Sequence, residues 1–437
     1  MSDFVTVIGG GLAGSAASLH LADLGIPVKL FEMRPSRMTP AHTGAGLAQL
    51  VCSNSLGSMS TFAANGILLA ELEKLNCRLV AIAKRTSVPA GGALAIDRTL
   101  FEDMVTKAVE DDKNITLVRE EAQSIPTESL SIIATGPLTS DAMISELKRM
   151  TSEDDLYFFD ATSPTVTLES LDMTRAFWGN RRDSEGTDYL NCPLSVEEFE
   201  SFHKELVSAE RVEIKDFEPD KLFESCLPIE IIASRDSEAL RFGPMKPIGL
   251  KNPQTGKGEY ALLQLRREDK DGTRLNLVGF QTRLKYSEQK RVFSMIPALK
   301  NAEYVRLGHM HKNLFLNAPK YLDKFLRLKS APNVFLAGQI TGGEGYLESV
   351  ALGVAVAHHV ADVFNGKSPE QFPSDTMLGA FIRSLIDYPG ENYQPLKVSF
   401  GMLPDLPKRI RNKRERRGVQ AERALKSMSD YLSNLKT

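Results

Sequence analysis

Cysteine and tryptophan are scarce in this sequence, which has 4 cysteines and 1 tryptophan among its 437 residues. The cysteines are Cys52, Cys77, Cys192 and Cys226. No two of them have the C-x-x-C spacing, and no histidine cluster stands beside them in the sequence. The pattern therefore argues against a zinc site and predicts reduced thiols in the cytosol.

Long apolar runs and a basic leader are missing as well. We find no run that approaches the length of a membrane span, and the opening residues Met1-Ser2-Asp3 lack the charge of a signal peptide. We therefore expect a cytoplasmic protein without a membrane partner. The net charge of −3 argues against a surface coated with basic residues for nonspecific nucleic-acid binding, so we expect no DNA partner. A local basic patch is compatible with that charge.

The stretch from Phe4 to Glu32 has the order strand, glycine turn, helix, strand, acid. Its run VTVIGGGLAG ends an apolar strand with the G-x-G-x-x-G spacing of a dinucleotide-binding βαβ unit. A helix that opens near Leu12 would direct its free N–H groups at a pyrophosphate, and Glu32 could accept hydrogen bonds from the ribose hydroxyls. The predicted cofactor-binding residues here are Gly9, Gly10, Gly11, Leu12, Ala13, Gly14 and Glu32.

Alternation of helix and strand continues to about residue 150. Apolar residues recur at helical spacing over 66–85 and 100–109, whereas 115–118 and 130–133 have the composition of buried strands. Beyond this point short strands separated by turns dominate. The best-marked helix there, over 195–209, opens with a Ser-x-x-Glu capping box.

The first pattern returns near residue 330, as an apolar strand over 333–337, a glycine-rich turn and a helix over 347–364. The sequence therefore predicts an α/β fold in which a doubly wound, Rossmann-like domain is interrupted by an inserted mixed α/β domain. The predicted parts are residues 1–150, 151–328 and 329–437, with the active site where the two domains meet. The second turn adds Gly338, Gly342, Gly343 and Gly345 to the predicted cofactor site.

Two basic clusters stand out. Residues 408–417 hold seven Lys or Arg in ten positions, and this tail is either a solvated helix face or a contact for RNA phosphates. A second cluster, Arg283, Lys285, Lys290 and Arg291, is open to the same two interpretations.

Eleven blocks in order along the chain resemble the bacterial folate- and FAD-dependent tRNA (uracil-5-)-methyltransferases. They are VIGGGLAGS, MTPAH, LVCSNSLGS, VPAGGALAIDR, ATGPLTS, DYLNCP, RFGPMKPIGL, LVGFQT, QKRVFSMIP, HMHKN and AGQITGGEGYLES. A more distant resemblance, in the glycine turn and AGQITG, is to FAD-using tRNA wobble-uridine modification enzymes. The chain departs from the family pattern at Thr43 to Leu47 and at Arg181-Arg182, and a paralogue acting on ribosomal RNA would carry similar blocks.

The resemblance implies FAD as the bound dinucleotide, 5,10-methylenetetrahydrofolate as the one-carbon donor, and NADH or NADPH as the reductant. It implies transfer of the one-carbon unit to C5 of a uridine in structured RNA, most often the T-loop uridine of tRNA, to give 5-methyluridine. It also implies that Cys52 and Cys226 are the two catalytic cysteines, and that no metal takes part.

The chemistry explains why two thiols are of interest. Uracil C5 is a poor nucleophile until a thiolate adds at C6. Cys52 precedes Ser53-Asn54-Ser55, residues that commonly cap helices, and a helix start would favour its thiolate, so we prefer Cys52 as nucleophile and Cys226 as the C5 base. The reverse assignment stays open. We expect Cys77 and Cys192 to be buried apolar residues, and His42 to be either a proton shuttle or a packed loop residue.

Two other functions fit the same motifs. One is an NAD(P)H-linked flavin oxidoreductase that acts on a small molecule. The other is a noncatalytic RNA-binding protein that keeps FAD as a structural ligand. Intact Cys52 and Cys226 favour an enzyme over the noncatalytic alternative.

Overall fold

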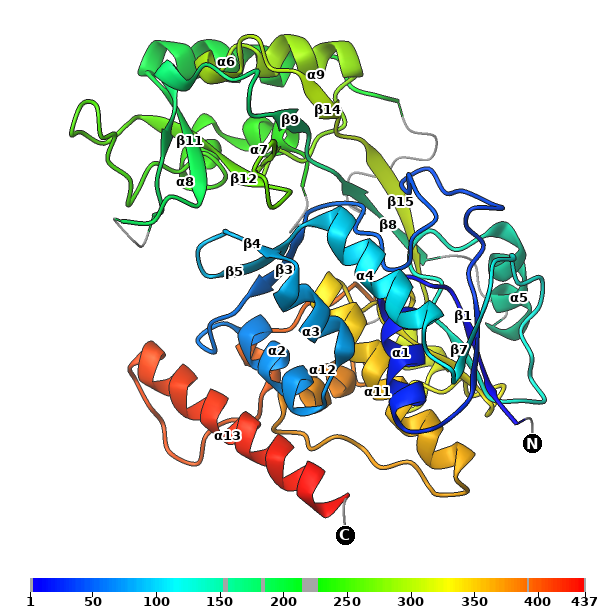
Figure 1. The fold of residues 1–437 in the computed structure, drawn as a ribbon. Coiled ribbons are helices and arrows are strands. Elements are labelled where there is room, and N and C mark those ends of the chain that lie inside the picture. The colour runs from blue at the N-terminus through cyan, green and yellow to red at the C-terminus, as the bar shows by residue number, and fades with distance from the viewer. Residues whose placement is uncertain (1–2, 152–155, 182–184, 214–226, 391–392, 436–437) are drawn as a thin grey trace.

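The fold has two lobes, seen in a computed structural model that describes residues 3–151, 156–181, 185–213, 227–390 and 393–435 (Figure 1). The larger lobe holds both ends of the chain. The smaller lobe is formed by the middle of the chain and lies at the top of Figure 1. Each lobe has its own apolar core. The second core draws its members from positions between Val166 and Leu299, whereas the first draws on the chain before and after that stretch.

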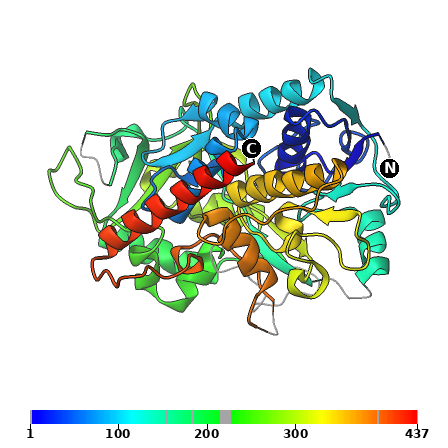
Figure 2. The ribbon, with the colours of Figure 1, turned by 90° about the horizontal axis from the view of Figure 1, so that it is seen from below.

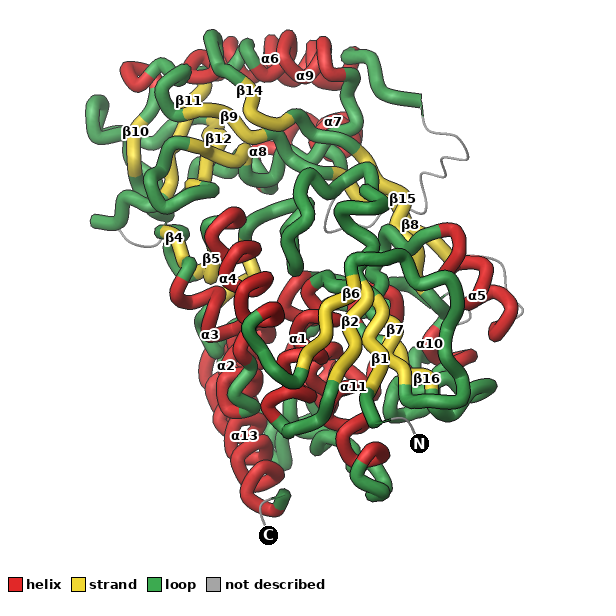
Figure 3. Tube along the Cα trace, turned by 45° about the vertical axis from the view of Figure 1, so that its right-hand side comes forward, coloured by secondary structure: helices red, strands yellow, loops and turns green. Residues whose placement is uncertain are grey.

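A five-stranded parallel sheet forms the centre of the larger lobe (Figure 3). Its order is β16 (Val334–Leu336), β7 (Ser131–Ile133), β1 (Val5–Ile8), β2 (Val28–Phe31) and β6 (Ile115–Val118). These strands are short and largely apolar, as expected for a parallel sheet covered on both faces. Because β16 pairs in register with β7, the chain re-enters the sheet after the smaller lobe. The predicted α/β fold with an inserted domain is confirmed, and its exact boundaries stay a prediction.

Helix α11 (Tyr346–Phe364) packs along α1 (Leu12–Asp23) at the heart of this lobe. The two backbones approach closely at Gly353, where a Cβ atom would overlap the carbonyl of Ala13. By length and composition α11 could cross a membrane, so the expectation that no such run exists was wrong. The most apolar 18-residue stretch of α11 is 78% buried inside the protein. The helix can therefore be apolar on all sides.

The run predicted as one helix over 66–85 is two helices, α2 (Ala64–Lys74) and α3 (Arg78–Arg85). Asn76 between them has a φ of 55°, a left-handed conformation that asparagine tolerates and a continuous helix forbids. The other helices of this lobe are α4 (Arg98–Glu110), α5 (Asp141–Thr151), α10 (Ala318–Tyr321), α12 (Met377–Ile386) and α13 (Lys413–Asn434).

The smaller lobe is built on a six-stranded antiparallel sheet. Its order is β10 (Phe177–Trp178), β11 (Tyr189–Leu194), β12 (Ala261–Arg267), β13 (Arg274–Leu277), β9 (Thr165–Thr167) and β14 (Tyr304–Arg306). Helices α6 (Val196–Ser208) and α9 (Tyr286–Phe293) cover it in Figure 1, with α7 (Ile229–Arg235) and α8 (Ser237–Phe242) beside them. The predicted capping box at Ser195 and Glu198 is confirmed.

Two small sheets lie between the lobes. The first is the antiparallel ribbon of β8 (Leu156–Ala161) and β15 (Met310–Phe315), which connects the two lobes. A second sheet contains β3 (Ser55–Ser58), β5 (Ala93–Ile96) and β4 (Ser87–Val88). A 3-10 turn, η5 (Gly338–Thr341), leads from β16 toward α11. The carboxyl ends of the parallel strands and both small sheets thus surround one region of the protein.

Candidate active site

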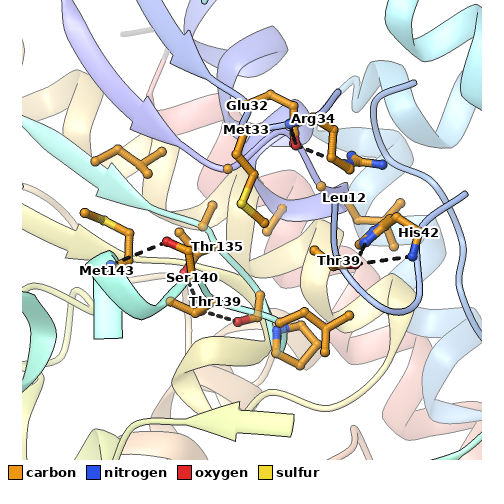
Figure 4. A pocket seen from close by; sticks show the side chains of 18 of the residues that line it. Leu12, Glu32, Met33, Arg34, Thr39, His42, Thr135, Thr139, Ser140 and Met143 are labelled. Carbon is orange, nitrogen blue, oxygen red and sulfur yellow. Dashed lines mark hydrogen bonds and ion pairs between the residues drawn. The ribbon is translucent and has the colours of Figure 1, made fainter. Parts of the chain in front are cut away.

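A large cavity opens at the carboxyl ends of β1, β2 and β7. It holds about 1000 Å³ of space, part of it open to solvent. Figure 4 shows Glu32 and Arg34 along one side, Thr139 and Ser140 across from them, and His42 on a loop at a third side. This is the crevice where doubly wound sheets bind their ligands, outside the ends of the parallel strands. We call it the first cavity.

The glycine turn between β1 and α1 borders the first cavity. Gly9 has a φ of +106°, and a Cβ atom there would lie 2.5 Å from the carbonyl oxygen of Ala134. A Cβ atom on Gly14 would overlap the carbonyl of Gly9. At Gly11, by contrast, no atom of the described residues lies within 4 Å of the Cβ position. Gly9 and Gly14 are therefore required by the protein's own packing, whereas Gly11 faces open space beside the start of α1.

The predicted cofactor residues divide into two sets. Gly9, Gly11, Leu12, Ala13 and Glu32 line the first cavity, whereas Gly10, Gly14, Gly338, Gly342, Gly343 and Gly345 are not part of its described lining. The second glycine-rich turn, which follows β16, packs against α1. Gly338 has a φ of +79°, and a Cβ atom there would lie 2.6 Å from the Cβ of Ala13, so this turn presses against α1.

Glu32 is buried and held by the protein on both carboxylate oxygens. Oε2 accepts the N–H of Gly10 at 2.9 Å, and Oε1 accepts the N–H and the Nε–H of Arg34, each at 2.9 Å. Burial opposes ionisation of Glu32, but the bonds from Arg34 and Gly10 hold its pKa below the usual value. The carboxylate is therefore ionised and fixed in orientation at the rim of the cavity. Arg34, which is 2% exposed, was not predicted as a site residue.

His42 also lines the first cavity. Its Nδ1 lies 2.6 Å from Oγ1 of Thr39. Burial, with the charge of Arg34 nearby, lowers its pKa to about 4, so the ring is neutral at physiological pH. Both predicted roles of His42, a proton shuttle and a packed loop residue, stay predictions.

A second cavity of about 700 Å³, also partly open to solvent, adjoins the first. The two share the wall residues Val51, Pro137, Leu138, Gln339 and Tyr346. Cys52, Asp160, Glu344, Gly345 and Lys397 are among the other residues that line the second cavity. The structure thus places Cys52, from the loop between β2 and β3, and Gly345, from the second glycine-rich turn, at the same cavity.

The backbone of Cys52 is held on both sides. Its N–H donates to the phenolic oxygen of Tyr346 at 2.7 Å, and its carbonyl accepts Nη2–H of Arg98 at 2.5 Å. Nη2 of Arg306 lies 3.5 Å from the same carbonyl. Both guanidinium groups also bond the buried carboxylate of Glu268, at 2.8 and 3.2 Å. Residues of the two lobes therefore meet directly behind the cysteine.

The chain after Cys52 does not form a helix. A strand, β3, begins at Ser55, so the expectation of a helix start that favours the thiolate was wrong. The physical reason is that Asn54 joins the lobes: its Nδ2 donates to the carbonyls of Ile96 at 2.8 Å and Arg267 at 3.0 Å. Burial and the charge of Asp160 raise the pKa of the Cys52 thiol to about 12, against the opposing effect of the two arginines.

The comparisons with known proteins agree with this geometry. The chain matches the family model described as Glucose inhibited division protein A over residues 4–368. It is 49% identical over 432 residues to the methylenetetrahydrofolate–tRNA-(uracil-5-)-methyltransferase TrmFO of Aquifex aeolicus, covering 99% of this chain and 97% of that protein. The chain belongs to this methyltransferase family. The family resemblance read from the sequence blocks is thereby confirmed.

Two further matches extend the comparison, one to a second relative and one to a solved fold. The methyltransferase of the same name from Thermotoga neapolitana is 50% identical over 429 residues, which cover 98% of each chain. A crystal structure of GidA from Aquifex aeolicus superposes with a TM-score of 0.69 at 16% identity, covering 98% of this chain and 73% of that chain. At this identity the GidA structure shows a shared fold.

The structure describes two of the remaining three cysteines. Cys77 and Cys192 are buried, as expected of small apolar residues. Cys226, the second predicted catalytic cysteine, lies outside the residues that the structure describes, so its role in this family member stays a prediction. The same holds for its neighbour Glu224.

The two basic clusters differ in their surroundings. In the first, Asn412 caps α13 by accepting the N–H of Arg414 at 2.9 Å, and the positions from Lys408 onward are mostly exposed. Figure 2 shows α13, in red, running across the outside of the larger lobe. In the second cluster, Lys285 pairs with Glu210 at 2.6 Å and Arg291 pairs with Glu205 at 2.5 Å. Acidic partners thus offset much of the charge of the second cluster.

Proposed function

We propose that this chain transfers a one-carbon unit from 5,10-methylenetetrahydrofolate to C5 of a uridine in structured RNA, with reduced FAD as cofactor and NADH or NADPH as reductant. The uridine would be that of the tRNA T-loop, and the product 5-methyluridine. The observation that carries the proposal is the common wall of the two cavities, since it sets a dinucleotide-type glycine turn beside the space lined by Cys52. Family membership supports the same reaction.

The first cavity has the features that FAD requires. The open space at Gly11 and the free N–H groups at the start of α1 suit a pyrophosphate, and the ionised Glu32 suits ribose hydroxyls. Gly9, Leu12 and Ala13 would complete the cradle. Bound FAD would supply reducing equivalents and a carrier for the one-carbon unit. Tyr346 and Gln339, which border both cavities, would contact the cofactor on one side and the uracil on the other.

The surroundings of Cys52 favour a proton-transfer role for its thiol. Burial and nearby carboxylates keep the thiol protonated, which disfavours it as the resting nucleophile. We therefore reverse the preference drawn from the sequence and assign addition at C6 to Cys226. In this assignment Cys52 removes the C5 proton after the one-carbon unit has been attached, and its own thiol proton first passes to an acceptor such as the Asp160 carboxylate of the same cavity.

Nucleoside mass spectrometry tests the proposed function directly. Total tRNA and rRNA are compared from cells with and without the gene, and 5-methyluridine should disappear from tRNA in its absence. Loss from rRNA alone would identify a ribosomal target instead. Unchanged 5-methyluridine in both RNAs would refute the methyltransferase assignment and leave a flavin oxidoreductase acting on a small molecule.

A further inference from the structure

Glu344 is a carboxyl group of the second cavity to which the reaction above assigns no role. It stands between Gly342, with a φ of +84°, and Gly345, with a φ of +119°. Its N–H donates to the carbonyl of Leu396 at 2.8 Å, and the N–H of Leu396 donates to the carbonyl of Gly342 at 2.8 Å. The backbone thus clamps a side chain that is only 6% exposed against the cavity that Cys52 lines.

The groups around Glu344 favour its neutral form. Burial and the negative charges of Asp160 and Glu348 together raise its pKa to about 8, against the opposing effect of Lys397. Nε2 of Gln339 donates to Oε2 of Glu344 at 2.5 Å, which leaves Oε1 as the other oxygen of the group. A neutral carboxyl has an O–H donor, which an ionised carboxylate lacks.

Two other titratable groups of this cavity are also uncharged, whereas Asp160 and Lys397 bring charge to its wall. Burial raises the pKa of Tyr346 above its ordinary value, and the Cys52 thiol is protonated for the reasons given above. The guanidinium groups of Arg98 and Arg306 bond Glu268 and the backbone carbonyl of Cys52. A neutral acid therefore faces the cavity from a buried position, where a hydrogen bond to a developing negative charge is stronger than in water.

We propose that Glu344 donates its carboxyl O–H to O4 of the uracil that enters the second cavity. The inference rests on the proposed function. When the thiolate forms its S–C6 bond, the C5–C6 π pair becomes the C4–C5 π bond and the C4–O4 π pair moves onto O4. The Glu344 proton stabilises this enolate oxygen. When C5 attacks the one-carbon unit, the electron pair returns and the proton stays with Glu344, so the group is unchanged after each turnover.

Glu348, in the first turn of α11, provides a matched control. It is 2% exposed, and its Oε1 accepts Nδ2–H of Asn65 at 3.1 Å. Burial raises its pKa as well. Glu348 is not among the described residues that line the second cavity, so substitution there keeps the proposed donor in place and only lowers the pKa of Glu344 by removing a nearby negative charge.

The test is single-turnover methylation of a tRNA transcript by the flavin-loaded enzyme. In the wild type the rate should be highest below pH 8 and fall as Glu344 ionises at higher pH. Glu344→Leu should lower the rate about 100-fold, the typical cost of removing one oxyanion donor. Glu344→Gln keeps an N–H donor that does not ionise, so it should lose less activity and lose the alkaline fall. Glu348→Gln should retain that fall.

The outcomes separate this inference from the function on which it rests. If the wild type forms 5-methyluridine and Glu344→Gln keeps the alkaline fall, or if Glu344→Leu is within about threefold of wild type, the inference is wrong and the function stands. If the wild type forms none, both fail. Infrared difference spectroscopy of wild type against Glu344→Gln gives an independent readout: the carbonyl band of a protonated carboxyl at pH 7 supports the inference, and its absence overturns it.

Discussion

The backbone N–H of Cys52 donates a 2.7 Å hydrogen bond to the phenolic oxygen of Tyr346, the first residue of α11. The bond ties the long loop after β2 to the segment that returns to the central sheet after the smaller lobe. Because Tyr346 belongs to the wall that the two cavities share, the position of Cys52 depends on the same side chain that borders the glycine-turn cavity. The predictions below test this arrangement.

Gly11→Val should give a folded but colourless protein. The Cβ position of Gly11 meets no described atom within 4 Å, so the side chain would collide with a bound pyrophosphate rather than with the protein. The absorbance of the purified protein and its melting temperature are measured together. Gly14→Val is the contrasting variant, because its Cβ would overlap Gly9 and should prevent folding. Full flavin occupancy in Gly11→Val would contradict the assignment of the first cavity.

Trapping with 5-fluorouridine should distinguish the two cysteines. Fluorine at C5 blocks removal of the C5 substituent, so an enzyme–RNA adduct formed at C6 persists through denaturation. We expect wild type and Cys52→Ala to trap RNA and Cys226→Ala to trap none, because the surroundings of Cys52 disfavour its thiolate. Denaturing gels with labelled RNA measure the adduct. The opposite pattern would restore Cys52 as nucleophile.

Neutralising Lys408, Arg409 and Arg411 should weaken RNA binding and reduce its salt dependence. Each lost phosphate contact lowers the slope of log affinity against log salt by about 0.7 to 0.9, so three contacts amount to about 2 to 3. The matched control is Lys285→Gln with Arg291→Gln, whose charges are already offset by Glu210 and Glu205. Filter binding over a salt series measures the slopes. An unchanged slope would mean that the tail is a solvated helix face.

Glu268→Ala should destabilise the contact between the lobes by about 3 kcal/mol, because it leaves the partly buried charges of Arg98 and Arg306 without their carboxylate. Burial opposes ionisation of Glu268, yet the two arginines hold its pKa below the ordinary 4.5. Its stabilisation is therefore present above pH 4.5 and is lost as pH falls through the lower, folded-state pKa.

Thermal unfolding of wild type and variant over acidic pH measures this contribution. The control is Asp111→Ala, which removes an exposed partner of Lys107 and should cost less than about 1 kcal/mol. Equal losses in the two variants would show that the Glu268 cluster does not stabilise the contact.

The sequence was informative where structure depends on neighbouring residues. The glycine turn, the strand over 333–337 and the capping box at Ser195 all follow from local spacing, and each formed as predicted. The break at Asn76 was missed because apolar spacing runs through it without interruption. A single residue with positive φ leaves the apolar pattern on either side intact.

The surroundings of Cys52 could not be read from the sequence. Three residues around it, Arg98, Glu268 and Arg306, are far apart in the sequence. No local sequence pattern therefore predicts that they meet. The same limit explains the helix wrongly expected after Cys52. Ser and Asn also suit turns and bridging contacts, and here Asn54 bonds Arg267 in the other lobe.

The pairing of Ser131 with Val334 has a consequence for synthesis of the chain. Strand β7 leaves the ribosome long before β16 exists, so until then it is an edge strand with unpaired backbone groups, and α1 lacks the helix that packs along it. The intervening lobe, by contrast, has emerged in full, with its own apolar core, by that time. A nascent chain stopped near residue 330 would therefore expose both an unprotected strand and the apolar side of α1, and would depend on chaperones until the last strand arrives.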